Sequence, residues 1–171
     1  MMRLRWLAPL AAAPIAQYAC ATQYLSVEQA QRAVFPAADA FVAEPLDAGA
    51  ASRLGAPPGW SPKIWRVRAG ASDLGWFMVD QVIGKSELIT YAIGVDRSGA
   101  LLALEILDYR EAHGGEIRLA GWRKQFAGKS AADPVELNRD IRNISGATLS
   151  CRHVTEGVQR LLRLMPAART P

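Results

Sequence analysis

The sequence predicts an α+β fold, in which a twisted and mostly antiparallel sheet is flanked by helices. Two observations support this prediction. Between residues 63 and 107, apolar side chains largely follow strand-like spacing in runs joined by hairpin-length connections. Near the C-terminus the spacing of apolar residues changes to three and four, which is typical of an amphipathic helix. Strands and helices do not alternate along the chain, so a doubly wound parallel sheet is disfavoured.

The first elements expected along the chain are a short helix and a long connection. Residues 24–35 predict the helix, in which Ser26 and Gln29 would form a capping box. Residues 36–62 are rich in Ala, Pro and Gly and predict a meandering connection with one short strand near Phe41. The connection leaves too little chain before it for a separate domain, so we expect one domain.

The sheet and the closing helix follow. Asp96 and Gly99 stand at the first and last positions of a predicted turn. The four strands of the expected meander cover residues 63–69, 75–83, 88–95 and 100–107. After them come a loop at residues 108–121, a short helix at 122–126, and an amphipathic helix that opens around 145–148 and ends before Pro166.

Composition excludes several classes of protein. The 171 residues include 20 Lys and Arg against 16 Asp and Glu, a net charge of +4. This charge is too small, and basic runs are too short, for nucleic acid to be the expected partner. Two cysteines and two histidines argue against a disulfide scaffold and against a four-ligand zinc site.

Residues 1–21 predict export to a periplasm. A short basic start precedes an apolar run at residues 6–16 and the small triplet Ala19-Cys20-Ala21. This arrangement is typical of a secretory signal peptide, cut here after Ala21. A buried N-terminal helix and a lipoprotein anchored at Cys20 remain as alternatives.

The expected organisation is a signal peptide at 1–21, a helix and connection at 22–62, and the main domain at 63–166. Export would leave Cys151 without a partner, and we expect it to be a buried residue.

The start of the last helix is the first candidate site. Ser145-Gly146-Ala147-Thr148 combines small side chains, two hydroxyls and backbone N–H groups that lack helical partners. The positive end of the helix dipole makes such a start suited to phosphate, with Lys129 or Arg152 as possible helpers. The alternative is that Ser145 or Thr148 only caps the helix.

Residues 143–150 (NISGATLS) resemble the flavinylation motif of the FMN-binding domain family, which includes the exported flavin subunits of the Rnf and Nqr redox complexes. The resemblance implies that Thr148 carries FMN through a phosphoester bond. It also implies a separate exported flavin transferase, which takes FMN from FAD and releases AMP. Upstream, Glu111-Ala112-His113-Gly114-Gly115 and then Trp122, Phe126 and Gly128-Lys129 are similar to the family's E-T-P-G loop and W-x(n)-F-x-G-K segment. The resemblance covers roughly residues 75 to 162.

The resemblance and the residue chemistry together give a set of expected cofactor contacts. These are Thr148, Ser145, Gly146, Ala147, Ser150, Glu111, Gly114, Gly115, Lys129, Tyr91 and Tyr109. For the two tyrosines, ordinary packing in the sheet remains an alternative. His113 is a candidate for proton transfer to the reduced flavin. Arg142 occupies a motif position at which the family has an acid, and Asp140 lies two residues earlier.

The function expected from these observations is electron transfer between membrane or periplasmic redox partners by an exported, covalently flavinylated protein. This makes the protein an electron carrier more than an enzyme with its own substrate. A flavin-dependent reductase of a small acceptor is one alternative. A binding or sensor module without flavin is another, and Arg142 is the residue that raises it. The oligomeric state is left open.

Overall fold

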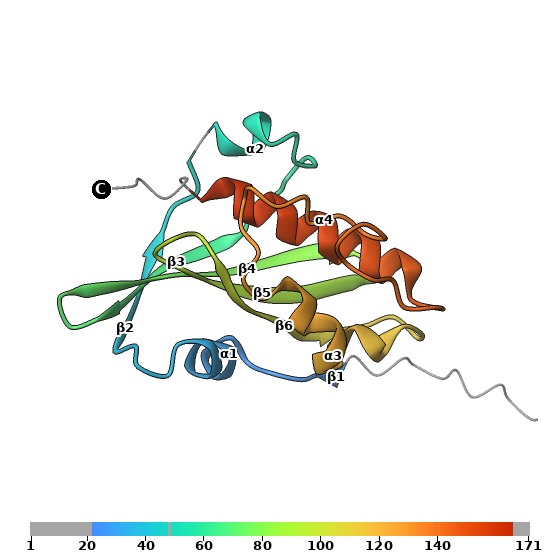
Figure 1. Ribbon diagram of the computed structural model, residues 1–171, viewed down its shortest axis with the longest axis horizontal. Coiled ribbons are helices and arrows are strands. Elements are labelled where there is room, and N and C mark those ends of the chain that lie inside the picture. Colours follow the sequence, from blue (N-terminus) through green and yellow to red (C-terminus); the bar gives the residue numbers. More distant parts are fainter. Residues whose placement is uncertain (1–21, 48, 166–171) are drawn as a thin grey trace, which may run out of the picture.

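The core of the molecule is one six-stranded antiparallel sheet (Figure 1). The structure is a computed structural model that describes residues 22–47 and 49–165. The strands are β1 (Thr22–Gln23), β2 (Ala40–Glu44), β3 (Lys63–Ala69), β4 (Ser72–Ile83), β5 (Leu88–Asp96) and β6 (Leu101–Tyr109). Their order across the sheet is β1-β6-β5-β4-β3-β2, with every neighbouring pair antiparallel. The α+β prediction is therefore confirmed.

Four α-helices accompany the sheet in the described part of the chain. They are α1 (Val27–Val34), α2 (Ala50–Arg53), α3 (Ala120–Arg123) and α4 (Thr148–Leu164), with 3₁₀ turns η1 (Gly115–Arg118) and η2 (Lys124–Phe126) beside α3. The predicted capping box is present, because Ser26 Oγ accepts from the N–H of Gln29 and the Gln29 side chain accepts from the N–H of Ser26. The sequence did not predict α2, a single turn inside the long connection, or the two-residue strand β1.

The two faces of the sheet carry separate hydrophobic cores. Helix α4 covers one face and α1 lies on the other (Figure 1). The core under α4 is the larger and includes Met78, Tyr91, Ile93, Leu104, Phe126, Val154, Val158 and Leu161. The core under α1 includes Ala30, Phe35, Val67, Phe77, Val79, Ala92 and Leu107. Elements before residue 63 thus pack on the same sheet as those after it.

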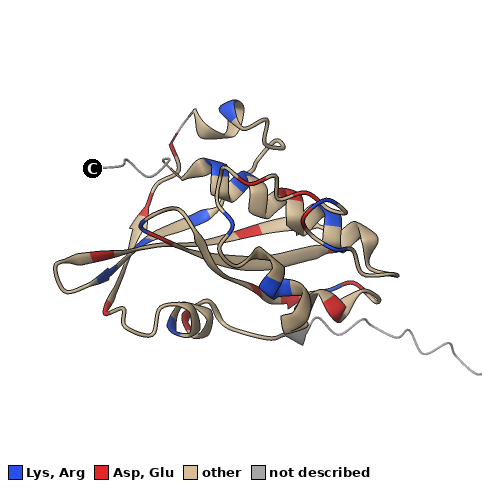
Figure 2. Ribbon diagram, viewed as in Figure 1, with Lys and Arg blue, Asp and Glu red and all other residues tan. Residues whose placement is uncertain are grey.

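Several smaller predictions can be checked in the structure. Cys151 is fully buried, as expected, and this burial raises the pKa of its thiol. Trp60 and Trp122 are buried, whereas Trp65 and Trp76 are only half-buried at the margins of the cores. Basic and acidic residues are interspersed over the ribbon (Figure 2).

The signal-peptide prediction concerns residues 1–21, which lie outside the described residues. Within the described part, no helix combines the length and apolarity needed to cross a membrane.

Gly157 of α4 lies close against the Tyr91 side chain of β5. A Cβ at this position would lie 2.2 Å from the Tyr91 hydroxyl and 3.0 Å from its Cζ. We expect Gly157→Ala to lower the free energy of unfolding by about 2–3 kcal/mol, because the buried ring has little room to move. Adding Tyr91→Phe should recover part of this loss, measured as a coupling energy in a double-mutant cycle of urea unfolding. Glu156→Ala, at the neighbouring exposed position, is the control. Strictly additive effects of Gly157→Ala and Tyr91→Phe would contradict the proposed contact.

Candidate functional site

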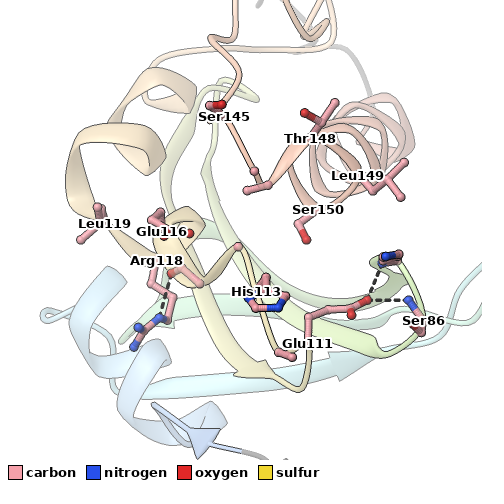
Figure 3. A pocket seen from close by; sticks show the side chains of 16 residues that line it. Ser86, Glu111, His113, Glu116, Arg118, Leu119, Ser145, Thr148, Leu149 and Ser150 are labelled. Carbon is pink, nitrogen blue, oxygen red and sulfur yellow. Dashed lines mark hydrogen bonds between the residues drawn. The ribbon is translucent and has the colours of Figure 1, made fainter.

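The main cleft lies between the N-terminus of α4 and the loop that follows β6 (Figure 3). Its volume is about 1000 Å³, at the upper end of the range for pockets that hold small molecules and cofactors. Three segments form its walls. They are residues 145–150 at the start of α4, residues 111–116 with Arg118 and Leu119 after β6, and Lys85 with Ser86 in the β4–β5 hairpin.

The N-terminus of α4 is open, with no side-chain cap. Ala147 is the N-cap residue and no side chain accepts a hydrogen bond from the first turn of the helix. The alternative in which Ser145 or Thr148 only caps the helix is therefore not what the structure shows. Free N–H groups at such a start, together with the helix dipole, favour a bound anion.

Thr148 presents its hydroxyl at this open end. Its side chain is exposed, and Oγ1 accepts a hydrogen bond from Asn143 Nδ2 at 3.0 Å. The other polar atom of the Asn143 amide, Oδ1, is buried and has no partner among the described residues. This orphaned atom beside the Thr148 hydroxyl indicates a polar environment that is incomplete as it stands.

Two glycines allow the backbone to come close to the cleft. Gly146 has φ +85°, and a Cβ added there would meet no atom within 4 Å. Gly114 has φ +87°, and its Cβ would lie 2.7 Å from the Tyr109 hydroxyl and 3.1 Å from Ala147 Cβ. Only glycine combines this backbone conformation with so little space, so Gly114 lets the loop after β6 lie against the start of α4.

Tyr109 links the loop after β6 to α4 through hydrogen bonds of its hydroxyl. Its hydroxyl donates to the carbonyl oxygen of His113 and lies 3.0 Å from Ser150 Oγ. Burial is the main cause that raises the pKa of Tyr109, while the Ser150 hydroxyl acts in the opposite direction. The ring is 4 % exposed. Tyr109 therefore supports the cleft from behind its lining.

Glu111 ties the loop to the β4–β5 hairpin. Its Oε1 accepts hydrogen bonds from the backbone N–H groups of Lys85, Ser86 and Glu87, the last two at 2.6 and 2.9 Å (Figure 3). Burial alone would raise the pKa of Glu111, but these three N–H groups and the Lys85 charge outweigh it and lower the pKa. One carboxylate thus fixes the distance between two walls of the cleft.

The lowered pKa of Glu111 predicts a pH dependence of stability. The ionised form stabilises the fold above the ordinary pKa of 4.5, and this contribution is lost as the pH falls through the lower, folded-state pKa. We expect Glu111→Gln to lower the free energy of unfolding by about 1–2 kcal/mol at pH 7. The difference from the unmodified protein should shrink below pH 4.5, as measured by urea unfolding at several pH values. Glu116→Gln, an exposed carboxyl in the same cleft, should change stability by less than about 0.5 kcal/mol. A pH-independent loss in Glu111→Gln would contradict the assignment.

The remaining lining of the cleft is both charged and apolar. Lys85 and Arg118 bring positive charge, and Glu116 brings a negative one. Leu119 and Leu149 line it with side chains that are 61 % and 41 % exposed. Exposed leucines beside an uncapped helix start suit a ligand that has both an apolar ring system and a phosphate. Among the described residues, no group of three His, Cys, Asp or Glu could hold a metal ion.

Most of the residues selected from the sequence come together in this cleft. Those that line it are Glu111, Gly114, Gly115, Ser145, Gly146, Ala147, Thr148 and Ser150. Tyr109 lies directly behind them, in contact with Ser150. His113 also lines the cleft and is exposed. Lys85 and Ser86 also line the cleft and are not among the residues predicted from the sequence. The hairpin expected between the strands at 75–83 and 88–95 was a signal that a second loop could reach the site.

Tyr91 and Lys129 do not line the cleft. Tyr91 is fully buried on β5, and its hydroxyl donates a hydrogen bond to Asp80 Oδ2 at 2.9 Å. The alternative of ordinary packing in the sheet therefore describes Tyr91. Lys129 Nζ forms an ion pair with Asp140 Oδ2 at 2.8 Å. Asp140 also accepts the N–H groups of Val135 and Glu136. Lys129 and Asp140 therefore hold the loop that leads to α4, and Asp140 is already engaged there.

An open helix start, a cleft of cofactor size and a mixed lining are the features expected of a domain that binds a phosphorylated organic ligand. Residues 84–163 match the family model of the FMN-binding domain. This match contains every residue that lines the cleft, and it confirms the resemblance found in the sequence. The matched segment indicates a flavin-binding protein. No curated protein matches the chain.

Proposed function

We propose that the protein is an exported flavoprotein that carries FMN esterified to Thr148 and transfers electrons between membrane or periplasmic redox partners. The observation that carries this proposal is the position of Thr148. Its exposed hydroxyl stands at an uncapped helix N-terminus, on the wall of a cleft of about 1000 Å³, inside a matched FMN-binding domain. An ester at this atom would keep the cofactor in a compartment where a dissociated flavin is not replaced.

The chemistry of attachment follows from the hydroxyl. Thr148 Oγ1 forms a new bond to the phosphorus of the FMN half of FAD, and the pyrophosphate bond breaks so that AMP leaves. An external base removes the hydroxyl proton of Thr148, which ends on the departing AMP phosphate. A separate flavin transferase catalyses this step. Asn143 Nδ2 donates to Oγ1, which leaves the hydroxyl hydrogen of Thr148 free to point toward an external base. Asn143 thereby orients the nucleophilic oxygen.

The donor set of the cleft fits FMN. The N–H groups of the first turn of α4 would face the remaining phosphate charge, and Gly146 leaves space for it. Lys85 and Arg118 supply positive charge in place of Lys129, which is paired elsewhere. Leu119 and Leu149 offer apolar surface to a ring system. When bound, FMN supplies the ability to accept and donate one or two electrons.

Protons for this chemistry would be held by side chains at the surface of the cleft. His113 and Glu116 line it, are exposed, and form no side-chain hydrogen bond with the described residues. Glu111 is unsuited to this role, because its carboxylate is occupied by three backbone N–H groups. We assign Glu111 to shaping the cleft.

A reductase acting on a small acceptor is the second candidate. This function is favoured by the openness of the cleft, in which Leu119 is 61 % exposed. A small acceptor could therefore reach the ring system of a bound flavin. Turnover of an acceptor by the isolated reduced protein would select this function over electron relay between proteins. Absence of flavin after maturation would select the binding or sensor module instead.

The direct test is the mass of the protein after periplasmic expression with a competent flavin transferase. We expect a mass gain of FMN less one water, and yellow-green fluorescence that persists on a denaturing gel. Trypsin cleavage after Arg142 and Arg152 releases residues 143–152 as one peptide, which should carry the flavin. An unmodified mass and a dark band would overturn the covalent assignment. Signal cleavage after Ala21 would be visible in the same mass spectrum.

A further inference from the structure

The chain around Thr148 carries positive charge that no neighbouring acid balances. Residues 141–155 include Arg142 and Arg152 and contain no Asp or Glu. Both arginines are exposed, and neither forms an ion pair within the described part of the chain. Their guanidinium groups are therefore available to an anion that approaches from solvent.

The backbone of Arg142 is fixed close to the acceptor threonine. Its N–H donates to Gln125 Oε1 at 2.9 Å, and its carbonyl oxygen accepts from Trp122 Nε1 at 2.8 Å. The next residue, Asn143, donates from Nδ2 to Thr148 Oγ1 at 3.0 Å. Arg142 and Asn143 line the same groove, which has a volume of about 850 Å³. This groove thus reaches the Thr148 hydroxyl through Asn143.

Arg152 lies on the helix side of Thr148. It follows Thr148 by four residues in α4, so the two side chains share one face of the helix. Long side chains on a helix lean toward its N-terminus, which directs Arg152 over the first turn. The next acid of α4, Glu156, forms no ion pair with Arg152. Thr148 therefore has one unpaired arginine in the loop before it and one on the helix after it.

The geometry of phosphoryl transfer limits what this chain can contact in FAD. The attacking oxygen, the phosphorus and the leaving oxygen lie roughly in line. With Thr148 Oγ1 as the attacking atom, the AMP half of FAD points away from this chain. The nonbridging oxygens of the flavin phosphate lie beside this line and carry negative charge in the transition state. Guanidinium groups suit such oxygens, because they donate two parallel hydrogen bonds.

The charge at position 142 acquires a physical meaning in this arrangement. Arg142 occupies the motif position at which the FMN-binding domain family has an acid. A carboxylate there could attract a cation or accept a proton, but it would repel a phosphate. An arginine attracts the phosphate directly, so the reversed charge is compatible with attachment at Thr148.

We propose that Arg142 and Arg152 bind the nonbridging phosphate oxygens of FAD while the transferase esterifies Thr148. The bond that forms joins Thr148 Oγ1 to the phosphorus of the FMN half, and the bond from this phosphorus to the AMP phosphate breaks. An external base takes the hydroxyl proton, which ends on AMP. The two arginines neutralise charge and form no covalent bond. The inference rests on the proposed attachment at Thr148 and assigns part of the phosphate recognition in that step to this chain.

The first test measures the rate of flavin attachment to the full chain by a purified transferase with FAD, followed by fluorescence of the denatured band. Arg142→Gln and Arg152→Gln should each lower kcat/KM about fivefold. Arg163→Gln makes the same charge change at the far end of α4 and should keep the rate of the unmodified chain. Equal rates in all these chains would overturn this inference and leave the proposed function standing. No attachment to any of them would overturn both.

The sign of the charge at position 142 gives a sharper comparison. Arg142→Asp should accept flavin more slowly than Arg142→Gln, and Arg142→Lys should lie between Arg142→Gln and the unmodified chain. Added salt should slow the unmodified chain more than the double variant Arg142→Gln/Arg152→Gln. A faster rate in Arg142→Asp would overturn the proposal, because it would show that this position serves a cation or a proton.

Inorganic pyrophosphate tests recognition without the transferase. In the full chain labelled with ¹⁵N, titration with pyrophosphate should shift the amide signals of residues 143–150. The double variant Arg142→Gln/Arg152→Gln should bind the probe about tenfold more weakly, with an unchanged midpoint of urea unfolding. Equal binding by both chains would overturn the proposal, because it would show that the N–H groups of the helix start suffice for the anion.

Discussion

Thr148→Val is expected to abolish covalent attachment of FMN. Valine has the shape of threonine without the hydroxyl, so no phosphoester can form. Because the Thr148 side chain is exposed, the free energy of unfolding should change by less than about 0.5 kcal/mol. The measurement is the flavin content of the peptide at residues 143–152, by mass and fluorescence after expression with the transferase. Loss of flavin in a protein of unchanged stability would identify Thr148 as the acceptor.

Two further variants separate Thr148 from its neighbours. Thr148→Ser keeps a hydroxyl and should retain attachment, although at a reduced rate. Ser145→Ala removes the other exposed hydroxyl of the motif and should retain full attachment. Flavin that persists in Thr148→Val would show that Ser145 or Ser150 is the acceptor and would refute the assignment.

Gly114→Ala is expected to lower the free energy of unfolding by about 2–4 kcal/mol and to reduce flavin attachment. Alanine at φ +87° is strained by about 1–2 kcal/mol. Its Cβ would also press on the Tyr109 hydroxyl at 2.7 Å and on Ala147 Cβ at 3.1 Å, which adds about 1–3 kcal/mol. Displacing Tyr109 would release its contacts with His113 and Ser150, and the two walls of the cleft would separate.

Gly115→Ala is the matched control for Gly114. It adds the same methyl group one residue later, where the backbone is not in the left-handed region and the nearest atom is Arg118 Nη2 at 3.4 Å. We expect a change within about 0.5 kcal/mol. Urea unfolding and flavin content would be measured for both variants. Equal effects of the two substitutions would contradict the steric argument for Gly114.

The fold could be predicted largely from local patterns. The β3 bounds follow from period-two alternation, and the start of α1 follows from a capping box that depends on residues three apart. What local patterns could not predict depends on contacts between distant residues. β1 is a strand because Thr22 and Gln23 pair with Tyr109 and Asp108. Two residues are too few to show the alternation of side chains that predicts a strand.

The candidate site also has a part that could be predicted from local sequence and a part that could not. Residues 145–148 could be predicted because the residues that form a helix start are consecutive in the sequence. Lys85 reaches the cleft because Glu111 binds its hairpin from 26 positions away, and no spacing rule reports such a contact. Lys129 and Tyr91 have suitable chemistry, but each is committed to a carboxylate outside the cleft, Asp140 and Asp80 respectively. Chemical type alone cannot show that a side chain already has a partner.

The strand order has a consequence for how the molecule folds. From β3 to β6 every strand pairs with its neighbour in sequence through a connection of two to four residues, so these hairpins close short loops and should form early. The contact of α4 with β4 and the pairing of β1 with β6 join distant parts of the chain and should form last. Thr148 and the loop after β6 come together only in that final step. If FMN is attached to Thr148 as proposed, a transferase that requires this assembled surface would modify only chains that have completed folding, so covalent flavin would report a correctly folded protein.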